Sequence, residues 1–298
     1  MGRTWLRSGV VLSMLSLVGA LRLPALAKAD TNSCWNGKRV LLAGASSGLG
    51  EALATELSAR GAKLVLAARR ADRLAMIAER CEKAREGATI STLTMDVTND
   101  PDILAGHVLD AEMLVGGPID CLLYTAGCGQ RTQAVETSAE GHRRLMATNF
   151  EGAVALSRAV LPSMLESSSG NIVVVSSVQG FFGQPGRTSY AASKAAVVGY
   201  FDSLRAEVAP SGVKVMTVIP GYIATDHSAS AVGSDGMADD NAKKGMLPEE
   251  LAVRIADGVE KQLPELVATQ PDGRIAMWLR ALWPSAVFRI MESKARKT

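Results

Sequence analysis

A tyrosine and a lysine one helical turn apart form the pair in this sequence best suited to proton transfer. Tyr190 and Lys194 are separated by three residues, so on a helix both side chains point into one cleft. An ordinary tyrosine has a pKa of about 10, and lowering it by about three units takes roughly 4 kcal/mol. A lysine cation ~4 Å away supplies about that much at an effective dielectric constant of about 20. The pair predicts general acid–base catalysis by Tyr190, the alternative being an ordinary surface pair.

A serine and an asparagine extend this chemistry. Ser177 follows a strongly apolar run, at the point where doubly wound sheets bind ligands, and its hydroxyl can donate to a substrate carbonyl oxygen. Ser176, the preceding residue, is the alternative candidate for this role. Asn149 lies in a long helical pattern, where asparagine is slightly unfavourable. We therefore expect Asn149 to have a functional role, such as holding a water near Lys194.

Three glycines form a turn suited to phosphate binding. Gly44, Gly48 and Gly50 follow an apolar run at 39–43 and open a helical pattern at 48–60. Glycines at such a point allow a tight turn and let the backbone approach a pyrophosphate, while the helix N-terminus offers free N–H groups to the anion. The turn therefore predicts a dinucleotide site.

Two arginines end the next apolar run, where this architecture places the adenosine ribose. Arg69 and Arg70 stand there, and no acidic residue occurs at 67–71. A carboxylate would bind a 2′-hydroxyl, whereas arginine accommodates a 2′-phosphate, so the pair favours NADP(H) over a merely solvated arginine pair. Asp96, which ends the third apolar run, either accepts from the adenine amine or caps the following turn.

Strands and helices alternate from residue 38 onward. Apolar runs predict strands over 39–43, 63–68, 89–96, 120–124, 171–176, 214–219 and 266–269. Helical patterns cover 48–60, 72–86, 101–114, 138–161 and 190–208. Unbroken apolar strands indicate a parallel sheet covered on both faces, and repeated strand–helix units predict a doubly wound α/β fold. We expect one domain over residues 35–270.

Taken together, these motifs resemble the short-chain dehydrogenase/reductase family. The matching residues, in order and spacing, are Gly44, Gly48, Gly50, Asn149, Ser177, Tyr190, Lys194, Pro220 and Gly221. The resemblance implies a Rossmann-type sheet of order 3-2-1-4-5-6-7, with Tyr190 as the acid/base. It also implies that Lys194 lowers the pKa of Tyr190 and holds the nicotinamide ribose. Ser177 would polarise the carbonyl, and Asn149 would support a proton-relay water.

The resemblance also implies which residues border the cofactor. They are Gly44, Ser46, Ser47, Gly48, Leu49, Gly50, Arg69, Arg70, Asp96, Val97, Ala126, Gly127, Asn149, Tyr190, Lys194, Pro220, Gly221, Ile223 and Thr225. The sequence departs from the family pattern in two places. Ala43 replaces a usual threonine, and Tyr124 and Thr125 replace two usual asparagines on the adenosine side.

Composition narrows the class of protein. The chain has 298 residues, of which 47% are hydrophobic and only 4% aromatic. Residues 1–29 hold four basic and no acidic side chains, and the remainder carries 28 basic against 30 acidic ones. This balance excludes a basic face for nucleic acid. Four cysteines are too few for a disulfide scaffold, and three scattered histidines suggest no metal.

The first residues have the pattern of a targeting segment. Arg3 and Arg7 precede an apolar stretch at 8–21, and a small-residue site follows at 25–27. This order is typical of a secretory or endoplasmic-reticulum signal within residues 1–29. A membrane anchor and an address to an organelle such as a plastid remain alternatives. The predicted location is the endoplasmic reticulum or another endomembrane.

The C-terminal region has an amphipathic composition. Segments 247–252, 275–280 and 293–297 resemble a membrane-associated group within the family, one linked to reduction of acyl-dihydroxyacetone phosphate in ether-lipid synthesis. Trp278, Trp283 and Phe288 with interleaved arginines suit an interfacial segment over 271–298. Packing on the protein's own surface or on a second copy is the alternative.

The predicted function is NADP(H)-dependent reduction of a hydrophobic or lipid-like ketone, a small-molecule substrate. A glycine-rich flap at 222–247 would cover it, facing a wall at 180–186 where Phe181 and Phe182 suggest an apolar end. A steroid or retinoid dehydrogenase and a 3-ketosphinganine-type reductase are the enzymatic alternatives. A non-catalytic, cofactor-binding protein of the membrane surface is the alternative of another class. The substrate, the direction and a homo-oligomeric state stay open.

Overall fold

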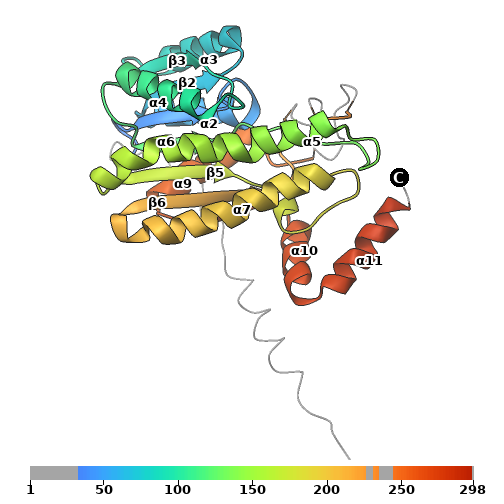
Figure 1. The fold of residues 1–298 in the computed structure, drawn as a ribbon. Helices are drawn as coiled ribbons and strands as arrows, with labels where there is room; N and C mark the ends of the chain where they lie inside the picture. Colours follow the sequence, from blue (N-terminus) through green and yellow to red (C-terminus); the bar gives the residue numbers. More distant parts are fainter. Residues whose placement is uncertain (1–32, 226–230, 235–243, 297–298) are drawn as a thin grey trace, which may run out of the picture. The chain divides into compact units, whose positions relative to one another are not determined.

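The structure is a computed structural model that describes residues 33–225, 231–234 and 244–296. Within them, parallel strands form one sheet of order β3-β2-β1-β4-β5-β6-β7, which confirms the expected Rossmann-type order (Figure 1). The strands are β1 Arg39–Ala43, β2 Lys63–Ala68, β3 Ile90–Thr94, β4 Cys121–Tyr124, β5 Gly170–Val175, β6 Val213–Pro220 and β7 Glu265–Ala268. The predicted signal segment lies outside the described residues.

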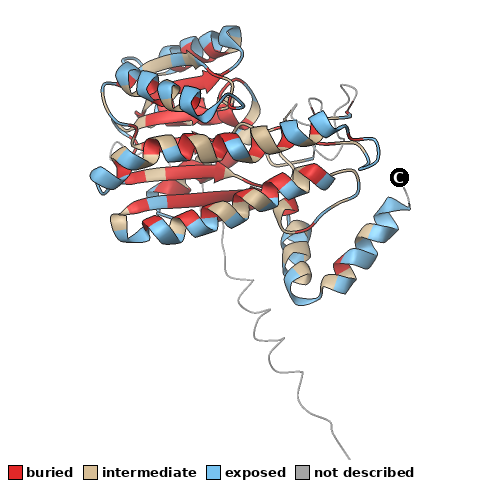
Figure 2. Cartoon of the chain, viewed as in Figure 1, coloured by how far each residue is buried: buried red, intermediate tan, exposed pale blue. Residues whose placement is uncertain are grey.

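Helices cover both faces of the sheet. One face is packed by α2 (Gly48–Ala59), α3 (Ala71–Ala84) and α9 (Pro248–Glu260). The other is packed by α4 (Pro101–Val115), α6 (Gly152–Glu166) and α7 (Thr188–Val208). Figure 2 shows the strands buried beneath helices whose outer faces are exposed. Burial on both faces explains why the inner strands are apolar along their length rather than alternating, whereas β3, at the edge of the sheet, has no buried residue.

The long helix predicted at 138–161 is divided in three. It consists of α5 (Ala139–Met146), a π-helical turn η2 (Ala147–Glu151) and α6. Pro162 lies inside α6, which continues to Glu166. The π turn spans only five residues, too few for a change of spacing to stand out in the helical pattern, yet such turns concentrate at functional sites. Here the turn contains Asn149.

Three helices near the C-terminus were not predicted as helices. The apolar side chains of α9 recur at helical spacing, at Leu251, Ile255 and Val259, so the signal was present. Beyond β7 follow α10 (Pro271–Leu282) and α11 (Pro284–Ala295), a helical pair. Within the described part of the chain, no helix is both long and apolar enough to cross a membrane.

Candidate active site

A cleft of about 1130 Å³ runs along the carboxyl ends of the strands. It is lined by every cofactor-bordering residue that the sequence predicts except Asn149. Side chains that are far apart in the sequence therefore meet at one edge, because parallel strands place their carboxyl ends together. The cleft has a proton-transfer end near α7 and an adenosine end near the start of α3.

Tyr190 and Lys194 occupy the proton-transfer end on adjacent turns of α7. Tyr190 is half-buried and lines the cleft, whereas Lys194 is only 5% exposed. The Lys194 Nζ donates a hydrogen bond of 2.9 Å to the Val175 carbonyl and lies 5.9 Å from the centroid of the tyrosine ring. The anticipated juxtaposition is present, with the ammonium fixed against the end of β5.

The two neighbouring serines have different partners. The Ser176 hydroxyl donates to the Lys194 carbonyl at 2.9 Å and so ties β5 to α7. Ser177 lines the cleft, accepts from the Gln179 N–H and hydrogen-bonds Tyr190. This geometry favours Ser177 for substrate contact, whereas Ser176 has a structural role.

Burial dominates the electrostatics of this end. It raises the pKa of Tyr190, because the phenolate would lose hydration, while the Ser177 hydrogen bond and the Arg187 cation act in the lowering direction. Burial also lowers the pKa of Lys194 to about 8. The expected net lowering of the tyrosine pKa by its lysine is therefore wrong for this structure. A phenol kept protonated is nevertheless suited to donating a proton.

Asn149 lies behind the cleft rather than on its wall. Its amide donates to the Cys128 carbonyl at 3.0 Å and to the Ser193 hydroxyl at 2.9 Å, and its oxygen accepts from the Cys128 N–H at 2.8 Å. The side chain thus links the loop after β4 to α7. The predicted proton-relay water stays a prediction, because the Asn149 amide is occupied by these three bonds and does not line the cleft.

The glycine turn fits a dinucleotide pyrophosphate. Gly44 has a φ of 92°, and a Cβ there would lie 2.4 Å from the Ala126 nitrogen; a Cβ at Gly50 would lie 2.2 Å from the Gly44 carbonyl oxygen. Only glycine permits this packing. Ser47 precedes α2 without a side-chain cap, so the first N–H groups of the helix can bind an anion.

The two arginines at the adenosine end behave differently. Arg70 donates to the Ser46 hydroxyl and to the Ser47 hydroxyl, both at 2.9 Å, and so braces the phosphate turn. Arg69 is 68% exposed, and its nearest carboxylate oxygen, on Asp96, is 3.8 Å away. Asp96 accepts from the Thr98 N–H and hydroxyl, which is the capping role left open by the sequence.

One departure from the family pattern is compensated. The Thr125 hydroxyl donates to the Ala43 carbonyl at 2.9 Å, beside the position where the family usually has threonine. A threonine directly after β4, the strand beside β1, thus supplies a hydrogen bond next to the glycine turn. The sequence alone did not pair these two residues because they are 82 positions apart.

Polar residues replace the expected aromatic wall. Gln179, Gln184, Arg187 and Tyr222 line the cleft and were not singled out, although Gln179 stands two residues after Ser177. The interpretation of Phe181 and Phe182 as cleft wall is wrong. Both pack away from it in a cluster with Val287 of α11. The flap is described in part, with residues 222–225 on the cleft.

Fold and site together define a nucleotide-dependent oxidoreductase of the Rossmann type. The short chain dehydrogenase model matches residues 38–235, and the chain belongs to that family. A dehydrogenase/reductase SDR family member 7B from Danio rerio is 39% identical over 269 residues, covering 87% of this chain and 86% of the relative. This similarity confirms the expected resemblance to the member 7B group of the family.

Two further similarities support this assignment. A dehydrogenase/reductase SDR family protein 7-like from Anopheles gambiae is 38% identical over 303 residues, 98% of this chain and 94% of the relative. A solved short-chain dehydrogenase from Sphingobium yanoikuyae in complex with NADPH has a TM-score of 0.69 and 29% identity, covering 87% of this chain and 94% of that one. Such oxidoreductases use an NAD(P) cofactor and a small-molecule substrate.

Proposed function

We propose that this chain reduces a ketone to a secondary alcohol with NADPH. The observation that carries the proposal is the meeting of Ser177, Tyr190 and Lys194 at one end of a cleft whose other end holds two arginines. When bound, the cofactor supplies the hydride. The Tyr190 hydroxyl donates the proton, Ser177 hydrogen-bonds the developing alkoxide, and Lys194 provides positive charge.

The adenosine end supports NADPH over NADH. Arg70, which braces the phosphate turn, and the exposed Arg69 supply guanidinium groups at this end, and guanidinium is suited to bidentate binding of a ribose 2′-phosphate. The solved relative is a complex with NADPH. Both observations favour the phosphorylated cofactor.

We propose a hydrophobic, lipid-like ketone as substrate. Acyl-dihydroxyacetone phosphate is the candidate that the group resemblance suggests, and steroid, retinoid or 3-ketosphinganine-type ketones are the alternatives. The test measures loss of NADPH absorbance by the purified protein with a ketone panel of these classes. Turnover of at least one lipid ketone supports the proposal. Tight NADPH binding with no turnover of any ketone would instead support a non-catalytic protein.

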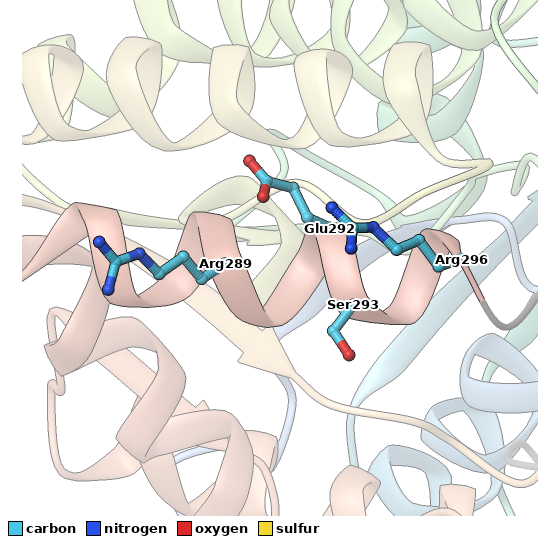
Figure 3. A pocket seen from close by; sticks show the side chains of 4 residues that line it. All are labelled: Arg289, Glu292, Ser293 and Arg296. Atoms are coloured by element: carbon cyan, nitrogen blue, oxygen red, sulfur yellow. The ribbon is translucent and has the colours of Figure 1, made fainter.

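The C-terminal helices support contact with a membrane surface. Large apolar side chains are exposed on α10, on α11 and at the residue between them: Ile275, Trp278, Leu282, Trp283, Phe288 and Ile290. Residues 271–296 carry five basic and two acidic side chains. Arg289, Glu292 and Ser293 of α11 and Arg296 just after it line a shallow pocket, so two cations border it (Figure 3). Exposed tryptophan and basic residues suit an anionic lipid interface, in an endomembrane such as the endoplasmic reticulum.

Fluorescence quenching tests this contact. Trp35 is fully buried, so in a Trp5→Phe background the exposed tryptophans are those of the C-terminal pair. Vesicles of brominated phosphatidylcholine with phosphatidylserine should quench Trp278 and Trp283. The matched control, which also carries Trp278→Tyr and Trp283→Tyr, should lose the quenching. Equal fluorescence with brominated and plain vesicles would contradict membrane contact.

A further inference from the structure

Gln130, in the loop after β4, is fully buried yet uses both ends of its amide. Its Oε1 accepts hydrogen bonds from the backbone N–H groups of Ser189, at 2.8 Å, and Tyr190, at 3.1 Å. Its Nε2 donates to the Thr137 hydroxyl at 2.9 Å and, at 3.2 Å each, to the Thr188 hydroxyl and the Thr132 carbonyl. A buried polar side chain with so many partners holds its surroundings in one arrangement.

These bonds satisfy the first turn of the helix that carries Tyr190. The first N–H groups of any helix lack partners within it, and the residue preceding the helix usually caps them with its own side chain. Here Arg187 precedes α7 and makes no such bond. Gln130 takes over the capping from 60 residues away, and one of the N–H groups it binds belongs to Tyr190 itself.

The loop that presents Gln130 is fixed on both sides. Asn149 binds the backbone of Cys128 through both its N–H and its carbonyl. The Val232 N–H donates to the Gly129 carbonyl at 2.9 Å, and the Val232 carbonyl accepts from the residue after Gln130 at 2.7 Å. The backbone on either side of Gln130 is therefore held in place by hydrogen bonds. The Gln130 side chain does not line the cleft.

We propose that Gln130 is a positioning residue for Tyr190. By capping α7 from outside, it fixes the first turn of the helix so that the phenol meets Ser177. It touches neither substrate nor cofactor, so its effect passes through the backbone of Tyr190. This inference rests on the proposed reduction only for its kinetic readout.

Two substitutions separate positioning from general stability. Gln130→Met keeps length but loses every hydrogen bond, so kcat should fall between about tenfold and about a hundredfold while the KM for NADPH stays within about twofold. The control is Ser138→Ala, which removes the cap of α5, a 3.0 Å bond from the Gly141 N–H. It removes the cap of a helix that packs beside α7 but leaves both Gln130 bonds to the first turn of α7 in place, so kcat should stay near wild type.

Gln130→Glu adds a signature that a structural role would not produce. A protonated carboxyl can accept and donate as the amide does, whereas the ionised form loses the donor and adds negative charge beside Tyr190. Activity should therefore approach wild type at low pH and fall as the carboxyl ionises. The other titratable or charged groups facing this turn are Arg187, Lys194, Cys128 and Tyr222, together with His142 of α5, which hydrogen-bonds the Ser189 hydroxyl. Both proteins share them.

The outcomes are distinguishable. Wild-type kcat in Gln130→Met, or equal losses in Gln130→Met and Ser138→Ala, would overturn the positioning role. Spectroscopic titration of Tyr190, taken as the difference from Tyr190→Phe, gives a readout that needs no substrate, and Gln130→Met should shift it. An unshifted titration would contradict the proposal. Absence of turnover in wild type with a shifted titration would refute the proposed reduction alone.

Discussion

The two ends of the cleft are built differently. At the proton-transfer end, Ser177 and Lys194 are 6% and 5% exposed, and each has a backbone partner. At the adenosine end, Arg69 is 68% exposed and only loosely paired. Burial fixes geometry and perturbs pKa values at one end, whereas an exposed cation at the other is accessible to a bound ligand. Substitutions at the first end should therefore change chemistry, and those at the second should change cofactor choice.

Removing the phenol should have the largest effect. Tyr190→Phe keeps the ring and its packing but has no proton to donate, so turnover should fall by about 10²- to 10⁴-fold. NADPH affinity, measured by fluorescence titration, should stay nearly unchanged because the adenosine end is untouched. Wild-type turnover in this variant would break the assignment of Tyr190.

The paired serines offer a sharper comparison within the same end. Ser177→Ala removes a donor aimed into the cleft and should lower kcat by about 10²-fold. Ser176→Ala removes the bond to the Lys194 carbonyl and should mainly lower the melting temperature. The check is kcat and thermal unfolding of both variants. The reverse ranking of the two kcat values would exchange their roles.

The adenosine end can be altered without affecting proton transfer. Arg69→Asp with Arg70→Ala should move the ratio of kcat/KM for NADPH over NADH towards NADH by at least about tenfold. The kcat with saturating cofactor should change little. An unchanged ratio of kcat/KM values would show that the two arginines do not determine the choice of cofactor.

The smallest expected effect is the dependence on pH. Burial lowers the pKa of Lys194 to about 8, whereas burial raises that of Tyr190, so the lysine loses its proton first as pH rises. Ketone reduction should be level below this value and decline above it. Lys194→Arg retains its charge, so its decline should move to higher pH even if its rate is lower. A wild-type rate that is level through this range would contradict a role for the cation.

Local patterns predicted the strands within one or two residues because unbroken apolar runs are a short-range signal. β1 and β2 begin and end where predicted. The Tyr190–Lys194 pair, the glycine turn and the arginine pair depend on spacing along a single element or turn, and all of them line the cleft.

Local sequence patterns could not predict contacts between segments that are distant in the sequence. Phe181 and Phe182 read as an apolar cleft wall, but α11 supplies another apolar surface for them. Gln130 carries no local signal, because its partners on α7 are 58 to 60 residues away. The sign of the Tyr190 pKa change also depends on burial, which spacing does not give.

Isotope transfer from the cofactor shows whether this chain delivers hydride to a ketone while Tyr190 donates the proton. NADPH carrying deuterium at both C4 positions is incubated with the purified protein and a lipid ketone, and the alcohol is analysed by mass spectrometry. Each alcohol should carry one deuterium on its carbinol carbon, with an equal amount of NADP⁺ formed and a large loss of both in Tyr190→Phe. Alcohol without deuterium, or equal transfer by Tyr190→Phe, would contradict the proposed reduction.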